Sequence, residues 1–180
     1  MSKAITPTSM TEAAKQAYQA GNYEKAASNY AAAATAYQAQ GNEVMAAEMS
    51  NNQSVALLQA GQAQAAFAAV EGTDKVFEKA GETLKMALAI GNQAAALEGM
   101  KKLKEAETRY KICAELLKDL GEDEQRARVM QSISSLQLRS GRQLEAIASM
   151  QAGMEGMKRP NLRQRILKKL LGLPGKLLNR

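Results

Sequence analysis

The sequence predicts an all-α fold, an α-solenoid of about four antiparallel helical hairpins, and three observations lead to it. Alanine recurs every forty residues, at Ala26, Ala66, Ala106 and Ala146. Glycine marks turns that are spaced by twenty residues or a multiple of twenty, at Gly21, Gly41, Gly61, Gly81, Gly121 and Gly141. No proline lies between residues 8 and 159, so that stretch lacks the strongest helix breaker. A period near forty residues with a turn at its middle is typical of stacked helical hairpins.

Two further columns of residues follow the same period. Twelve residues before each repeated alanine comes a small side chain, and four residues after it comes a larger apolar one. The small set is Ala14, Ser54, Ala94 and Ser134, and the larger set is Tyr30, Val70, Tyr110 and Met150. Small side chains at fixed positions predict helices that approach one another closely. One turn breaks the pattern, because Lys101 stands where a glycine is due and Gly99 comes two residues early.

The first two hairpins are predicted from turn signals and apolar stripes. Residues 1–7 are expected to form a flexible leader, with a helical repeat domain at 8–157 and a basic segment at 158–180. Thr8, Ser9 and Thr11 offer N-caps for a helix at about 9–20. Helices at about 23–38, 43–60 and 62–79 follow. Gly72 lies inside the last of these, where glycine destabilises a helix by about 1 kcal/mol relative to alanine, so a kink or break is expected there.

The third hairpin allows two interpretations. A split near Gly99 follows the forty-residue register, whereas a split at Gly91 uses the better turn dipeptide, Gly91-Asn92. We favour the register, because Ala106 then takes the position of Ala26. The fourth hairpin is regular: acidic residues after Gly121 suit a helix start, and Gly141 separates that helix from the last one.

The composition excludes several classes of site. The chain has no histidine and one cysteine, Cys113, which argues against disulfide scaffolds, cysteine-rich zinc sites and histidine acid–base chemistry. We therefore expect no catalytic residue, no cofactor and no metal. No uncharged apolar run approaches twenty residues, and the first residues lack the apolar core of a secretion signal. The expected location is the cytoplasm, with a possible peripheral association with a membrane.

The stretches at 17–30 and 52–66 resemble the turn between paired helices of the tetratricopeptide-repeat (TPR) family. The resemblance covers about residues 8–157, and the period near forty is similar to the longer-helix variants of that family in adaptor and vesicle-trafficking proteins. It implies a right-handed superhelix that recognises other proteins and performs no catalysis.

The resemblance also implies which side chains line a partner-binding groove, since the first helix of each hairpin faces it in that family. These residues are Lys15, Tyr18, Gln19, Asn51, Val55, Leu58, Gln59, Arg128, Gln131, Ser135 and Arg139. The alternative is that they form ordinary solvated helix faces. The pattern with which one subclass grips the carboxylate of chaperone tails is not reproduced, because only Asn52 fits it.

Methionine is abundant, and Met150, Met154 and Met157 follow one another at helical spacing. Flexible methionine commonly fills gaps between small side chains in a core. A soft binding surface on the last hairpin is the alternative.

The basic tail, residues 158–180, carries eight of the 24 basic residues and none of the 18 acidic ones, so acidic residues slightly outnumber basic ones elsewhere. A helix at about 161–171 is predicted, ending before Pro174. Its apolar and basic residues are expected to form a docking segment for a membrane or partner: Leu162, Arg163, Arg165, Ile166, Lys168, Lys169, Leu170, Leu173, Lys176 and Leu177.

Three interpretations of this tail remain open. It could cap the exposed end of the last hairpin, as repeat arrays require. It could dock on an anionic membrane surface or a membrane-embedded partner, which leucine beside lysine and arginine suits. Contact with nucleic-acid phosphates is the least favoured interpretation, because residues 158–180 contain no aromatic side chain that could stack on bases.

The sequence thus predicts an adaptor or assembly subunit that binds a protein partner through its groove and its tail, with a membrane complex as one candidate partner. The alternative is a peripheral membrane-surface protein anchored by the tail.

Overall fold

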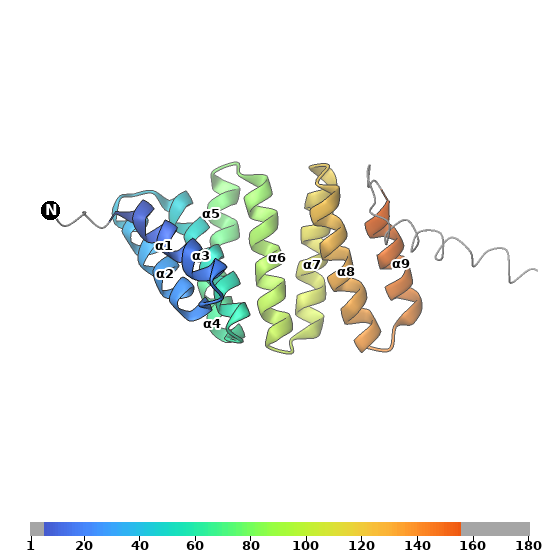
Figure 1. The fold of residues 1–180 in the computed structure, drawn as a ribbon. Coiled ribbons are helices and arrows are strands. Elements are labelled where there is room, and N and C mark those ends of the chain that lie inside the picture. Colours follow the sequence, from blue (N-terminus) through green and yellow to red (C-terminus); the bar gives the residue numbers. More distant parts are fainter. Residues whose placement is uncertain (1–5, 156–180) are drawn as a thin grey trace, which may run out of the picture. The chain divides into compact units, whose positions relative to one another are not determined.

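The structure, a computed structural model, describes residues 6–155 and is helical throughout that range, which confirms the all-α prediction there (Figure 1). Residues 1–5 of the predicted leader and the predicted tail at 158–180 lie outside the described residues. The helices are α1 (Pro7–Gln19), α2 (Tyr23–Ala39), α3 (Glu43–Gln59), α4 (Ala63–Val70), α5 (Thr73–Lys79), α6 (Thr83–Gly99), α7 (Leu103–Asp119), α8 (Asp123–Arg139) and α9 (Gln143–Met154).

Short turns with one repeated geometry join the helices. After α1, the amide of Gly21 donates to the carbonyl of Tyr18 at 3.0 Å and that of Asn22 to Ala17 at 2.8 Å. This pair of hydrogen bonds is a Schellman motif, which needs a left-handed residue after the helix. Gly21 supplies it with a φ of 76°, and the other turn glycines adopt similar values. At the turn between α6 and α7 the left-handed residue is Lys101, with a φ of 65°.

The first helix begins earlier than predicted. Thr6 is its N-cap, and its hydroxyl accepts from the amide of Ser9 at 3.1 Å, while the Ser9 hydroxyl accepts from the amide of Thr6 at 2.9 Å. Pro7 occupies the first turn, where its missing N–H leaves no helical hydrogen bond unmade. Threonine and proline together therefore start the helix before Thr8.

The other predicted boundaries agree with the structure to within a residue or so. The break at Gly72 is confirmed, since α4 ends at Val70, α5 begins at Thr73, and Gly72 between them has a φ of 77°. The helix boundary predicted near Gly99 is confirmed as well, since α6 continues through Gly91 and ends at Gly99. Buried side chains on both sides of Gly91, such as Ile90 and Ala94, offset the helix-weakening effect of this glycine.

The chain divides into two compact units, Met1–Arg109 and Tyr110–Arg180, with the division inside α7. The core of the first unit is built largely from alanine on α1 to α4 and α6, with Tyr30, Met49 and Leu57 as its large members. A second cluster in this unit gathers Ala47, Phe77 and Ala89. Because alanine buries little area, the helices must approach closely to exclude water.

In the second unit, α8 and α9 pack on each other. Ile133 and Leu136 are buried on α8. An added Cβ on Gly153 would lie 2.8 Å from the Cβ of Met130, so glycine permits this close approach of the two helices. The repeated alanines and the small column before them, in both units, are at most 1% exposed: Ala26, Ala66, Ala106, Ala146, Ala14, Ser54, Ala94 and Ser134.

Candidate functional site

The predicted groove residues of α1 lie on its accessible side. Lys15 is exposed and pairs with Glu12, with 3.0 Å between Nζ and Oε1, and this hydrogen-bonded carboxylate raises the pKa of the lysine. Tyr18 is half-buried, and its ring meets that of Tyr23 edge to face at a centroid distance of 5.3 Å. Gln19 is exposed at the end of the helix.

The predicted residues of α3 differ among themselves in exposure. Gln59 is exposed, Val55 and Leu58 are half-buried, and Leu58 packs against the alanine-rich core. Asn51 is buried, and all its amide atoms bond within the protein. Its Nδ2 donates to the carbonyl of Ala47 and to Oγ1 of Thr73, both at 2.9 Å, and its Oδ1 accepts from Nδ2 of Asn92 at 3.1 Å. Asn51 therefore serves the interior of the first unit.

Asn51 belongs to a polar network around the break between α4 and α5. Thr73 donates from Oγ1 to the carbonyl of Val70 at 2.8 Å. Gln93 donates from Nε2 to the same carbonyl at 3.3 Å and to Oδ1 of Asp74 at 2.8 Å. Val70 ends α4, so its carbonyl lacks a continuing helical partner, and these side chains satisfy it. The network holds the broken helix against α3 and α6.

Sequence reasoning did not assign Thr73, Asn92 or Gln93 to a buried hydrogen-bond network. One signal was available in the sequence. Gln93 stands forty residues before Ile133, so a polar residue occupies a register position that is apolar in the next repeat, and both residues are buried. A buried amide at such a position indicates an internal hydrogen-bond partner.

The predicted residues of α8 form one exposed stripe in the second unit. Arg128, Gln131, Ser135 and Arg139 are all exposed, and their spacing of three or four residues places them on one side of the helix. Leu138, which was not predicted, lies next to this stripe and is 51% exposed. Leu138 shares one position of the forty-residue register with Tyr18, Leu58 and Glu98, which lie at intervals of forty residues before it.

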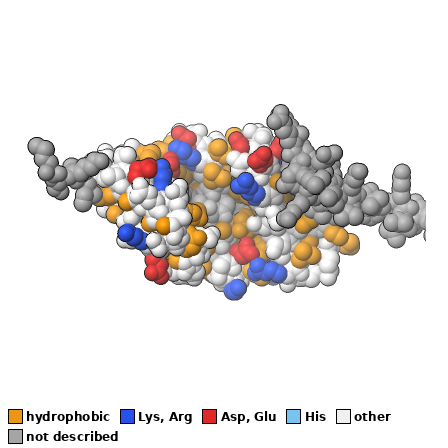
Figure 2. All heavy atoms as spheres, viewed as in Figure 1, with side chains coloured by type: hydrophobic (Ala, Val, Ile, Leu, Met, Phe, Trp, Pro, Cys, Tyr) orange, Lys and Arg blue, Asp and Glu red, His pale blue; other side chains and the backbone are white. Residues whose placement is uncertain are grey.

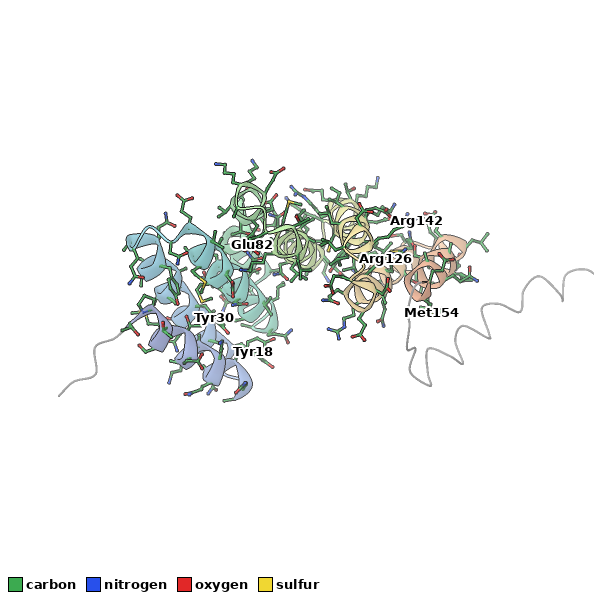
Figure 3. All side chains as sticks on the ribbon, turned by 90° about the horizontal axis from the view of Figure 1, so that it is seen from above. Tyr18, Tyr30, Glu82, Arg126, Arg142 and Met154 are labelled. Carbon is green, nitrogen blue, oxygen red and sulfur yellow. The ribbon has the colours of Figure 1, made fainter. Side chains whose placement is uncertain are left out.

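Arg126 is a second residue of α8 that the sequence did not reveal. It is 9% exposed, and its Nη1 donates to the carbonyl of Ala152 at 2.8 Å and, more weakly, to that of Glu155 at 3.4 Å. Figure 3 labels Arg126 and Met154, the last residue of α9. A guanidinium at the end of α9 satisfies terminal carbonyls and complements the negative end of the helix dipole.

In the first unit, α3 is also joined directly to α1 and to α6. Thr11 Oγ1 of α1 lies 3.2 Å from Sδ of Met49 on α3, and Nζ of Lys85 on α6 lies 3.2 Å from Oε2 of Glu48 on α3. The second pair is about one-third exposed on each side, so it contributes at most about 1 kcal/mol. Together with the bond between Asn51 and Asn92, these contacts keep α1, α3 and α6 in register.

Three surface hollows of the first unit are open to solvent, and small and polar residues make up most of their lining. One runs between the end of α2 and the start of α3, and two lie beside turns, next to Tyr23 and next to Met100. On the face shown in Figure 2, basic and acidic side chains are interspersed over the described residues. Between residues 6 and 155, no three acidic or cysteine side chains converge on a possible metal position.

Cys113 and Tyr30 are among the titratable or nucleophilic residues that are buried. Cys113 is 1% exposed, and Tyr30 is 6% exposed. Burial raises the pKa of the Tyr30 phenol, because the charged phenolate loses solvation. None of the helices in the described part of the chain combines the length and hydropathy that crossing a bilayer requires.

Comparison with protein-family models finds no match to this chain, and comparison with curated proteins finds none either.

Proposed function

We propose that the helices pair as antiparallel hairpins of a TPR-like α-solenoid: α1 with α2, α3 with the broken helix α4–α5, α6 with α7, and α8 with α9. The Schellman turns at every twenty residues support this arrangement, because each reverses the chain after the same number of residues. The small residues that recur every forty positions support it as well. They are buried in every repeat, as expected if each repeat packs its helices through the same contact. α1 against α2 and α8 against α9 are among the most extensive helix contacts.

We infer that the protein is an adaptor or assembly subunit, which binds a protein partner through the exposed sides of α1 and α3 in the first unit and of α8 in the second unit. One observation carries this inference. Tyr18, Leu58 and Leu138 share one register position, and they remain half-buried or exposed although the surrounding core uses mainly small residues. Exposed apolar side chains flanked by polar ones, here Gln59 and Arg139, are typical of partner-binding surfaces.

The rigidity of the first unit supports the same function. Its polar network and its close alanine contacts fix the positions of α3 and α6 before a partner arrives. A preorganised surface binds with less loss of conformational entropy than one that must order on binding.

Site-specific photo-crosslinking in cells tests the proposal. A photoreactive residue replaces Gln59 or Gln131 on the first helices, and Ser28, an exposed residue of α2, serves as the control position. We expect a discrete adduct of defined mass from Gln59 and Gln131, absent from Ser28 and weakened by Leu138→Gln at the Gln131 position. Equal labelling from all three positions, or none, contradicts partner binding on this side.

Association with an anionic membrane surface is the second candidate. The observation that favours it is the concentration of eight basic residues at 158–180, beside leucine and isoleucine. Co-sedimentation with phosphatidylserine vesicles tests it. Binding that requires residues 158–180 and weakens with added salt supports a membrane role, whereas equal sedimentation of the truncated chain contradicts it.

A further inference from the structure

The last described helix, α9, presents apolar side chains to solvent. Leu144 is 83% exposed and Ile147 is 40% exposed. At the register position of Ile147, Ala27 on α2 is buried and Phe67 on α4 is half-buried. α2 packs against α3 and α4 packs against α6, which are later first helices. Within residues 6–155, α9 has no later helix beside it.

Leu144 also differs in residue type from the residues at the same register position in the earlier repeats. Glu24, Gln64 and Lys104 occupy its position in the earlier repeats, and all three are exposed. Glu24 and Gln64 stay exposed although a later helix packs against α2 and α4. Leu144 therefore adds to the exposed apolar surface of α9, while Ile147 marks the side that a later helix covers.

The register predicts where that surface lies in the sequence. α3, α6 and α8 begin at Glu43, Thr83 and Asp123, forty residues apart, so the next first helix would begin at residue 163. Four apolar residues of the basic tail before Pro174 fall in register with it: Ile166, Leu167, Leu170 and Leu173. Their counterparts eighty residues earlier on α6 are all buried or half-buried: Met86, Ala87, Ile90 and Gln93.

The basic residues of the tail fit the same register. Arg163 and Lys168 correspond to Thr83 and Leu88, which are exposed on α6. Lys169 corresponds to Ala89, which is buried, and a lysine there can lay its stem on apolar surface while its ammonium reaches water.

We propose that residues 162–173 of the same chain cover α9, in the place that α3 occupies beside α2. Pro174 falls at the register position of Ala94 and Ser134 and ends this covering segment halfway along a first helix. The segment buries Ile147 and turns Arg163 and Lys168 to solvent. The proposal rests on the hairpin arrangement proposed above, and it assigns the apolar side of the tail to the protein itself.

Hydrogen exchange of α9 in the full chain tests this assignment. Ile166→Gln with Leu170→Gln removes two apolar side chains from the covering side. Arg163→Gln with Lys168→Gln makes two changes in the same segment on its solvent side and is the matched control. We expect the first pair to speed exchange of α9 amides by roughly tenfold or more, because apolar contact is lost. The second pair should leave exchange unchanged.

Other occupants of the α9 surface give different results. If a second copy covers it, protection of α9 rises with protein concentration and falls on dilution, which overturns the proposal. If the tail instead serves a membrane, both pairs leave α9 unchanged in solution and the first pair loses binding to phosphatidylserine vesicles, which also overturns it. Crosslinking from Gln59 does not involve the tail, so failure of this proposal is distinguishable from failure of partner binding by the first helices.

Discussion

An added Cβ on Gly99, the last residue of α6, would lie 2.7 Å from the Cβ of Ala63, the first residue of α4. That distance is shorter than carbon atoms tolerate, and Ala63 has no flexible side chain that could move away. The glycine that comes two residues before its expected turn is therefore a packing residue, and it allows two helices of the first unit to touch.

Gly99→Ala should destabilise the protein by about 1–3 kcal/mol, as overpacking does in a tight contact. The same substitution in a free helix would stabilise it by about 1 kcal/mol, so the expected sign is opposite to helix propensity. Urea unfolding measures the change.

The double variant with Ala63→Gly is the control, because it removes the opposing methyl group. Recovery of most of the lost stability in the double variant indicates that the contact is the cause. A Gly99→Ala protein as stable as the natural one contradicts the packing role.

Lys101→Gly should stabilise the protein by about 1 kcal/mol, because Lys101 holds a left-handed conformation that favours glycine. Its counterparts at the other turns, such as Gly61 and Gly141, adopt that conformation as glycines. Thermal unfolding reports the gain. Lys101→Ala is the matched control: it removes the charge, keeps the Cβ and should bring no comparable gain. If both variants are equally stabilised, charge and not backbone conformation is the cause.

These two residues show how far the sequence predicts the fold. The forty-residue register located every turn, including the one at Lys101, because helix length and turn geometry repeat together. The role of Gly99 was not predictable, since a close approach of α6 to α4 depends on crossing geometry that no single segment contains. The start of α1 at Pro7 was missed because Thr6 and Ser9 cap the helix jointly.

The candidate surface was predicted less completely. Helical spacing placed Arg128 and Gln131 on an exposed side of α8. Spacing alone could not separate Asn51 from them, because its burial arises from Thr73 and Asn92 on other helices. Leu138 was overlooked because a leucine beside a core stripe is ordinarily interpreted as core.

Thr73→Val should destabilise the protein by about 1–2 kcal/mol. The variant keeps the side-chain shape but removes the hydroxyl that donates to the carbonyl of Val70 and accepts from Asn51. Thr35→Val is the control, because Thr35 is exposed and its hydroxyl donates only to Ala31 of the same helix. Its effect should stay within about 0.5 kcal/mol. Equal effects of the two substitutions in urea unfolding contradict a stabilising network.

Tyr30 should make stability fall at high pH. Its pKa in the folded protein is raised above the ordinary value of 10.0, so the unfolded chain loses the phenol proton first as pH increases. The free energy of unfolding therefore keeps its full contribution from the Tyr30 phenol below about pH 10 and decreases as the pH rises above that value. Urea midpoints at a series of pH values should fall more steeply for the natural protein than for Tyr30→Phe. Parallel curves contradict a buried phenol.

Ser54 and Ser134 share one register position and should respond in opposite directions to substitution by alanine. Both are buried, but Ser134 Oγ donates to the carbonyl of Ala146 at 2.8 Å, whereas Ser54 Oγ meets no hydrogen-bond partner in the described residues. Ser134→Ala loses a hydrogen bond between α8 and α9 and should cost about 1 kcal/mol.

Ser54→Ala removes an unsatisfied buried hydroxyl, and it should be neutral or stabilising by up to about 1 kcal/mol. Ala14 and Ala94 at the same register position show that alanine fits there. Each variant serves as the control for the other, because the chemical change and the register position are identical. If urea unfolding shows equal losses of stability for both variants, Ser54 also forms a hydrogen bond within the protein. The close helix contact at Ser54 would then depend on its hydroxyl and not on small size alone.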